Sequence, residues 1–138
     1  MKEKGTQTCI DLFGCKEELL NDSSFLKNMI EEAIVKSDFI LVEPIRMHKF
    51  NPQGVTGYAL LSSSHIAIHT WPEYNFASID VFACDSRKKV NIALRTMLKR
   101  LNPDKIKSLN FSRGFICQKN VKNLNTNGLV PVPVANAV

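Results

Sequence analysis

Long apolar runs are absent from this sequence, since none approaches the ~20 consecutive residues that a membrane-spanning helix needs. The opening residues Met1-Lys2-Glu3-Lys4-Gly5 are polar and lack the apolar core of a signal peptide, so we expect a cytoplasmic protein without a membrane partner. Internal repeats and a clear domain linker are also missing. At 138 residues the chain has the length of one domain, and we expect a single domain over 1–138.

The cysteines do not form a C-x-x-C pair, which argues against a zinc ribbon or a thioredoxin-type motif. They are Cys9, Cys15, Cys84 and Cys117. Without an export signal their thiols should stay reduced, so disulfides are not expected. We interpret Cys9 and Cys117 as small buried hydrophobic residues.

A strong charge imbalance is lacking as well. Lys and Arg number 18 and Asp and Glu number 13, which gives a net charge of +5 with only short basic runs. Hydrophobic residues make up 44% and charged residues 22%, a composition of folded rather than disordered chains. The pattern lacks a basic helix and a basic stripe interleaved with aromatic residues, so we expect no nucleic acid partner.

Alternation of apolar and polar residues predicts strands at 6–13, 39–42, 55–61, 64–70, 76–84 and 105–111. Apolar stripes at helical spacing predict two helices, one after the N-cap candidates at 22–24 and one over 86–101. The element order β-α-β-β-β-β-α-β predicts an α+β fold, a two-layer sandwich of a largely antiparallel sheet with both helices on one face. For residues 115–138 we expect a loose tail.

The segment from Ser62 to Cys84 holds most of the residues that could carry chemistry. His65 and His69 suggest a metal site, but i and i+4 stand about 13 Å apart on a strand, so one ion would require distortion. A Ser-His-Asp hydrolase is a second possibility, although the G-x-S-x-G elbow is missing. Each residue taken singly also fits an ordinary strand without catalytic function.

The same segment resembles a known enzyme family. The run Ser64-His65-Ile66-Ala67-Ile68-His69-Thr70-Trp71-Pro72-Glu73-Tyr74, followed by Ser78-Ile79-Asp80-Val81-Phe82-Ala83-Cys84, is similar to the short bacterial and archaeal type of S-adenosylmethionine decarboxylase proenzyme. His48-Lys49-Phe50 with Pro52-Gln53-Gly54-Val55-Thr56-Gly57, and the early Leu12-Phe13-Gly14-Cys15, resemble that family too. The resemblance covers roughly residues 6 to 100.

The resemblance implies that the chain cuts itself between Ser63 and Ser64 into a β chain, 1–63, and an α chain, 64–138. Ser64 would become a covalent pyruvoyl group, the family's only cofactor, which forms a Schiff base with the substrate. His69 matches the base that removes the Cα proton during processing, and Cys84 matches the thiol that returns a proton to the substrate. The family uses no metal.

The implied substrate is S-adenosylmethionine, and the decarboxylated product serves as aminopropyl donor in spermidine biosynthesis. Phe50 matches an aromatic residue that stacks on adenine, Glu73 matches a carboxylate that binds the ribose hydroxyls, and Trp71 could line the pocket. The resemblance also implies a homodimer with active sites built between subunits.

Two features leave alternatives open. Ser63 stands where the family usually has Glu, so a pyruvoyl enzyme acting on ornithine or arginine is a second hypothesis. The net charge of +5 supports a third, a non-cleaving homologue that acts as a regulatory or basic nucleic-acid-binding module. Ser64 and His69 also have opposite parity, so a regular strand would point them to opposite faces. The implied mechanism therefore predicts an irregular backbone, a turn or bulge, at 62–64.

Overall fold

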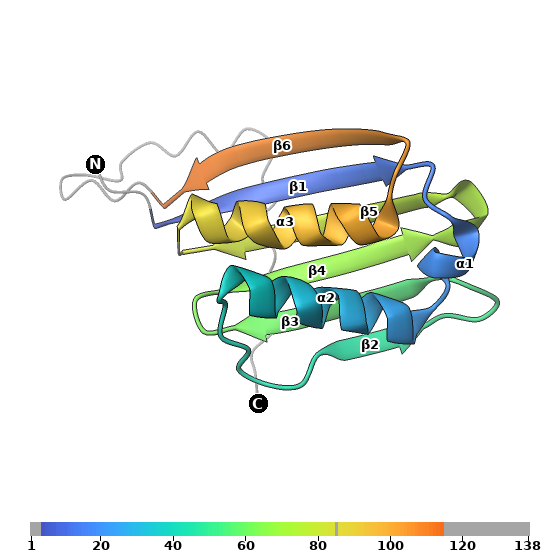
Figure 1. Ribbon diagram of the computed structural model, residues 1–138, viewed down its shortest axis with the longest axis horizontal. Helices are drawn as coiled ribbons and strands as arrows, with labels where there is room; N and C mark the ends of the chain where they lie inside the picture. The colour runs from blue at the N-terminus through green and yellow to red at the C-terminus, as the bar shows by residue number, and fades with distance from the viewer. Residues whose placement is uncertain (1–3, 85, 115–138) are drawn as a thin grey trace, which may run out of the picture.

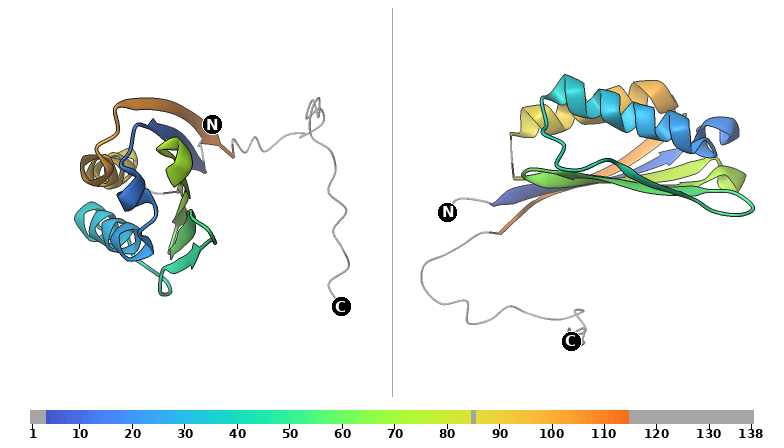
Figure 2. Two further views of the ribbon diagram at one scale, coloured as in Figure 1. Left: turned by 90° about the vertical axis from the view of Figure 1, so that its right-hand side faces the viewer. Right: turned by 90° about the horizontal axis from the view of Figure 1, so that it is seen from below.

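A computed structural model describes residues 4–84 and 86–114, which form one antiparallel sheet covered on one face by two long helices (Figures 1 and 2). The sheet is six-stranded, in the order β2-β3-β4-β5-β1-β6, so the predicted two-layer α+β fold is confirmed. The elements are β1 (Gly5–Phe13), α1 (Glu17–Leu20), α2 (Ser23–Ser37), β2 (Arg46–Lys49), β3 (Val55–Leu61), β4 (Ser64–Trp71), the 3-10 turn η1 (Pro72–Tyr74), β5 (Phe76–Ala83), α3 (Arg87–Leu101) and β6 (Lys105–Arg113).

The predicted strand at 39–42 is wrong. This segment forms only an isolated bridge between Leu41 and Leu61, after which Pro44 interrupts further pairing. The edge strand is β2, four residues further on, which pairs with β3. β2 showed no alternation in the sequence because three of its four residues are exposed. The one-turn helix α1 was also not predicted, and the expected tail at 115–138 lies outside the described residues.

Both long helices begin and end at residues suited to those places. The Asp22 carboxylate accepts a hydrogen bond from the Phe25 N–H, and the Ser86 hydroxyl accepts one from the Lys89 N–H. Asp38 and Asn102 adopt left-handed conformations just past the two helices. These local signals fix where α2 and α3 lie along the chain, and tertiary packing then fixes them against the sheet.

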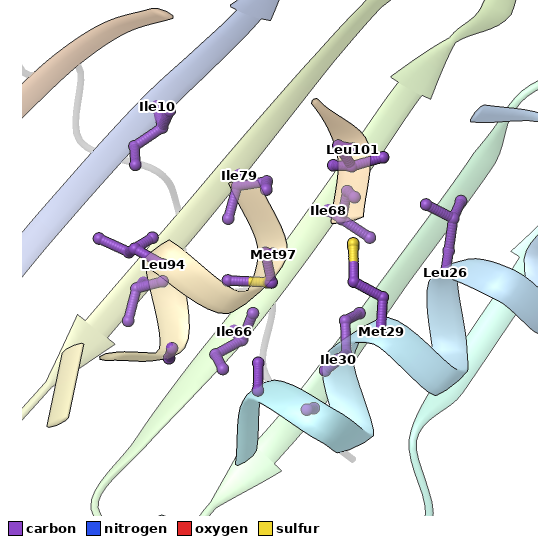
Figure 3. Packing of buried hydrophobic residues seen from close by; sticks show 14 of the residues in the cluster. Ile10, Leu26, Met29, Ile30, Ile66, Ile68, Ile79, Leu94, Met97 and Leu101 are labelled. Atoms are coloured by element: carbon purple, nitrogen blue, oxygen red, sulfur yellow. The ribbon is translucent and has the colours of Figure 1, made fainter. Parts of the chain in front are cut away.

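The core lies between the helices and one face of the sheet. Ile66, Ile68 and Ile79 project from β4 and β5 toward Met29 and Ile30 of α2 and Leu94, Met97 and Leu101 of α3 (Figure 3). Along β4 the residues of this face are buried, whereas those between them are half-buried or exposed. Period-two alternation therefore assigns each strand residue to a face, as the sequence predicted.

The opposite side of the sheet, which we call the open face, carries no covering layer within the described residues (Figure 2). Large apolar side chains remain exposed there: Phe13, Tyr58, Leu60, Trp71, Leu109 and Phe111. Exposed apolar side chains gathered in this way are typical of interaction surfaces. Within the part of the chain that the structure describes, no helix is long and apolar enough to cross a membrane.

Two substitutions on α2 test where the core lies. Ile30 is fully buried, whereas Val35 on the same helix is 78% exposed. We expect Ile30→Ala to lower the free energy of unfolding by ~2–5 kcal/mol, because it leaves a cavity against the sheet. Val35→Ala should change it by less than about 0.5 kcal/mol. Urea denaturation of both variants checks this, and equal losses would contradict the described packing.

Candidate functional site

The turn that joins β3 to β4 is made of two serines. Leu61 and Ser64 face each other in the ladder, so Ser62 and Ser63 alone form the loop. The Ser62 N–H donates a hydrogen bond of 2.9 Å to the Ile40 carbonyl, which anchors the loop to the segment after α2. Ser64 is therefore the first ladder residue of β4, paired on its other side with Ala83 of β5.

An unsatisfied hydroxyl lies at this turn. The Ser64 Oγ is buried and has no hydrogen-bond partner among the described residues. Buried polar atoms without partners are rare in proteins and require a specific explanation. The Cys84 backbone N–H donates a hydrogen bond of 3.2 Å to the Ser63 carbonyl, the group bonded to the Ser64 nitrogen. The orphan hydroxyl thus adjoins a carbonyl that is polarised by a backbone donor.

The cysteines have different surroundings. Cys84 is exposed and follows β5 beside the serine turn. Cys15 is buried, and this burial, together with the charge of Asp104, raises the pKa of its thiol to about 11. Cys9 is half-buried on the open face, so the prediction that it is buried is wrong. Its partial burial, and to a lesser extent Asp80, raise the pKa of its thiol. Cys117 lies outside the described residues.

A second cluster lies at the opposite end of β4. A pocket of about 330 Å³ there brings together four residues that the sequence singled out: Phe50, His69, Trp71 and Glu73. The His69 Nδ1 lies 3.1 Å from the Thr56 Oγ1. The Trp71 ring lies 6.4 Å from the His69 ring, centroid to centroid, so this face of the pocket is aromatic.

Three residues of this cluster had no role assigned from the sequence. Gln53 Nε2 donates a hydrogen bond of 3.3 Å to Glu73 Oε2, and the His48 ring meets Phe50 edge-on with centroids 4.6 Å apart. With Thr56, these residues orient the pocket side chains. Their signal was present in the segment from His48 to Gly57, but sequence alone could not assign their contacts because they come from two strands and the loop between them.

The two clusters do not meet within one chain. Ser64 and His69 are five residues apart on a regular strand, which separates them by about 17 Å. The side chain of Ser64 lies on the helix side of the sheet, whereas that of His69 lies on the open face. Irregular backbone is present at Ser62 and Ser63 but ends before Ser64, so it does not bring the hydroxyl and the imidazole together.

His65 and His69 share the open face of β4, and this strand keeps a regular ladder with β3, without the distortion that binding one ion by both would require. Within residues 4–84 and 86–114, no group of three or more His, Cys, Asp or Glu side chains is placed to hold a metal ion.

The chain belongs to the S-adenosylmethionine decarboxylase family, whose sequence model matches residues 6–114. The match extends beyond residue 100, where the sequence resemblance had ended, and so includes β6.

Similar curated proteins are named S-adenosylmethionine decarboxylase proenzyme. One from Methanococcus maripaludis is 38% identical over 122 residues, covering 88% of this chain and 99% of its own. One from Thermodesulfovibrio yellowstonii is 35% identical over 118 residues, covering 86% of this chain and 87% of its own.

Two solved structures share the fold. The adenosylmethionine decarboxylase of Aquifex aeolicus superposes with a TM-score of 0.80 at 29% identity, covering 87% of this chain and 98% of its own. The Trypanosoma brucei AdoMetDC-delta26 monomer gives a TM-score of 0.58 at 15% identity, a likeness of fold alone. This chain covers 45% of that longer protein.

Alkylation rates compare the thiol of Cys84 with that of Cys15. We expect iodoacetamide at neutral pH to modify Cys84 readily, because it is exposed, and to leave Cys15 unmodified until the protein unfolds, because it is buried with a raised pKa. Peptide mass spectrometry after timed quenching measures both rates. Comparable rates for Cys15 and Cys84 in the folded protein would contradict the described burial.

Proposed function

We propose that this protein is an S-adenosylmethionine decarboxylase that makes its own pyruvoyl group from Ser64. The observation that carries the proposal is the buried Ser64 hydroxyl without a partner, next to a carbonyl that accepts a hydrogen bond from the Cys84 N–H. A hydroxyl left unsatisfied in a folded core costs free energy, so its retention needs a chemical reason. Membership of the decarboxylase family supplies that reason.

The processing chemistry follows from these groups. The Ser64 Oγ attacks the Ser63 carbonyl carbon, the peptide nitrogen leaves, and an ester replaces the amide. The Cys84 N–H stabilises the negative charge that develops on the carbonyl oxygen during this step. A base then removes the Cα proton of residue 64, and the Ser63 carboxylate departs by β-elimination. The resulting dehydroalanine takes up water and loses ammonia, which leaves the pyruvoyl group.

Ser63 takes part in this scheme through its main chain. Its carbonyl is the group that is attacked, and no step uses its side chain. The serine that stands at 63 in place of the family's usual glutamate is therefore compatible with processing.

When formed, the pyruvoyl ketone supplies an electron sink for decarboxylation of an α-amino acid. The chain's own residues then have two tasks, to hold the substrate and to return a proton to its Cα. We assign the proton to Cys84, whose exposed thiol follows the strand end at which the ketone would form. A donor in this position acts in the transition state rather than in binding.

The pocket at the other end of β4 suits a nucleoside. Phe50 and Trp71 offer aromatic surfaces to adenine, and stacking of this kind contributes ~1–3 kcal/mol per base. The Glu73 carboxylate can accept hydrogen bonds from ribose hydroxyls, while Gln53 holds one of its oxygens in place. Such a set favours S-adenosylmethionine over a simple amino acid.

The distance between the clusters leads us to propose a homodimer whose sites are shared. The open face exposes apolar side chains that a second copy would cover. If two open faces pack about a twofold axis with their β4 strands running in opposite directions, His69 of one copy comes to lie near the Ser64 main chain of the other. The Cα proton of Ser64, which the base has to remove, is directed away from the side chain and so toward that open face. A twofold interface forms both sites at once. We place this dimer, with its product destined for spermidine synthesis, in the cytoplasm.

Two substitutions separate processing from turnover. We expect Ser64→Ala to remain one 15.5 kDa chain, because no hydroxyl can attack residue 63. Cys84→Ala should still yield two chains but decarboxylate at least about 100-fold more slowly, because its proton donor is lost. Intact-mass spectrometry reads the first result. Release of ¹⁴CO₂ from S-adenosylmethionine, with ornithine and arginine as control substrates, reads the second; turnover of a control substrate alone would refute the assignment.

Mixed dimers test the shared site. We expect neither Ser64→Ala nor His69→Ala to cleave when expressed alone. Co-expressed, the His69→Ala chain should be cut, because its intact Ser64 meets an intact His69 from the other copy. The two chains carry different affinity tags, and the mass of the tag on the His69→Ala chain identifies the product. Cleavage of His69→Ala alone would remove His69 as the base, and absence of cleavage in mixed dimers purified through both tags would exclude a shared site.

A further inference from the structure

Helix α3 is the most strongly charged element that the structure describes. Its 15 residues, RKKVNIALRTMLKRL, include six Lys or Arg and no Asp or Glu, whereas the whole chain carries a net charge of +5. The sequence interpretation had found no basic helix, because apolar residues separate the two short basic runs. Both runs lie on this helix, which the sequence predicted over 86–101, and its buried residues, such as Ala93 and Met97, face the sheet and leave the charges outward.

Three of these residues, Arg95, Lys99 and Arg100, border a groove between the two long helices. The groove has a volume of about 470 Å³ and is lined by Glu32, Lys36, Arg95, Thr96, Lys99 and Arg100. α2 and α3 lie side by side on the side of the sheet away from the open face (Figures 1 and 2). The groove therefore lies on the opposite side of the sheet from the pocket formed by Phe50, His69, Trp71 and Glu73. The proposed dimer, which joins the open faces, would leave the groove accessible.

One carboxylate organises the groove. Glu32 forms ion pairs with Lys36, at 2.6 Å, and with Arg100, and these hydrogen bonds lower the pKa of Glu32. Within residues 4–84 and 86–114, no carboxylate pairs with Arg95 or Lys99. The four basic residues thus face a single acid, which leaves a local charge of +3 for an anion to neutralise.

The spacing of the basic residues and the lining of the groove limit which class of anion could bind there. Arg95 and Lys99 are one helical turn apart, a rise of about 6 Å, so a ligand with regularly repeated charges can engage both. The lining has no aliphatic or aromatic side chain, so it lacks the apolar surface that inserts into a membrane, and it would hold a nucleic acid by the phosphates rather than by stacked bases. The Thr96 hydroxyl already donates to the Ile92 carbonyl, at 2.9 Å.

We propose that this groove binds the phosphate backbone of single-stranded RNA without sequence preference. Arg95 and Lys99 contact phosphates directly, and Lys36 and Arg100 add to the attraction while Glu32 limits it. The proposal does not rest on the proposed catalytic function, because it uses none of the residues assigned to processing or to substrate binding. It revises the expectation, drawn from sequence, that the protein has no nucleic acid partner.

The test is fluorescence anisotropy of the cleaved, full-length protein with a labelled single-stranded RNA of mixed sequence, over a series of salt concentrations. We expect log affinity to fall linearly with log salt. Arg95→Gln/Lys99→Gln should weaken binding at least about fivefold at low salt and reduce the slope by about 2. Glu32→Gln should tighten binding, because it removes the only carboxylate of the groove.

A matched control removes the same charge elsewhere. Lys16→Gln/Lys27→Gln lowers the net charge equally but touches α1's N-terminus and the far end of α2, and it should change the affinity by less than about twofold. Self-cleavage and ¹⁴CO₂ release should be unchanged in every variant. Binding without salt dependence, an equal loss in the control pair, or preference for phosphatidylglycerol vesicles over RNA would overturn the proposal.

Discussion

The alternation of side chains along β4 is the constraint from which the rest of the arrangement follows. Even-numbered residues of this strand face the helices and complete the core, while odd-numbered residues face outward. Ser64 therefore shares a face with Ile66 and Ile68, and His69 cannot join it without breaking the ladder on both sides. A strand held by two neighbours does not bend to bring Ser64 and His69 together, so the proposed chemistry would have to be assembled in another way.

The unequal faces of the sheet would allow the proposed assembly between two copies of the chain. One face has a complete apolar layer beneath α2 and α3. The other carries polar residues of the candidate site, such as His69, together with exposed aromatic residues. Phe13, Phe76 and Trp71 lie in successive tilted contacts with centroids 5.2 and 5.3 Å apart on that second face. Stability thus depends on one surface of these strands, which leaves the open face for the proposed association and substrate binding without loss of the core.

Much of this could be predicted from the sequence. Period-two and helical spacing located both long helices and five of the six strands, because their residues have one buried side. β2 was missed because an edge strand with exposed side chains leaves no hydropathy pattern, and α1 because a single turn is too short to show one. The grouping of Phe50, His69, Trp71 and Glu73 was anticipated only through resemblance. The contacts of Gln53 with Glu73 and of Thr56 with His69 depend on register, which the sequence does not specify.

The strand order determines how a break at the turn of Ser62 and Ser63 would divide the sheet. A nick after residue 63 would leave β1, β2 and β3 on one polypeptide and β4, β5 and β6 on the other. In the sheet, however, β1 is inserted between β5 and β6, so the two polypeptides are interdigitated rather than stacked end to end. Withdrawing the shorter piece would require parting three ladders, those of β3 with β4, β5 with β1, and β1 with β6. A severed backbone would accordingly behave as one cooperative body whose halves separate only upon denaturation.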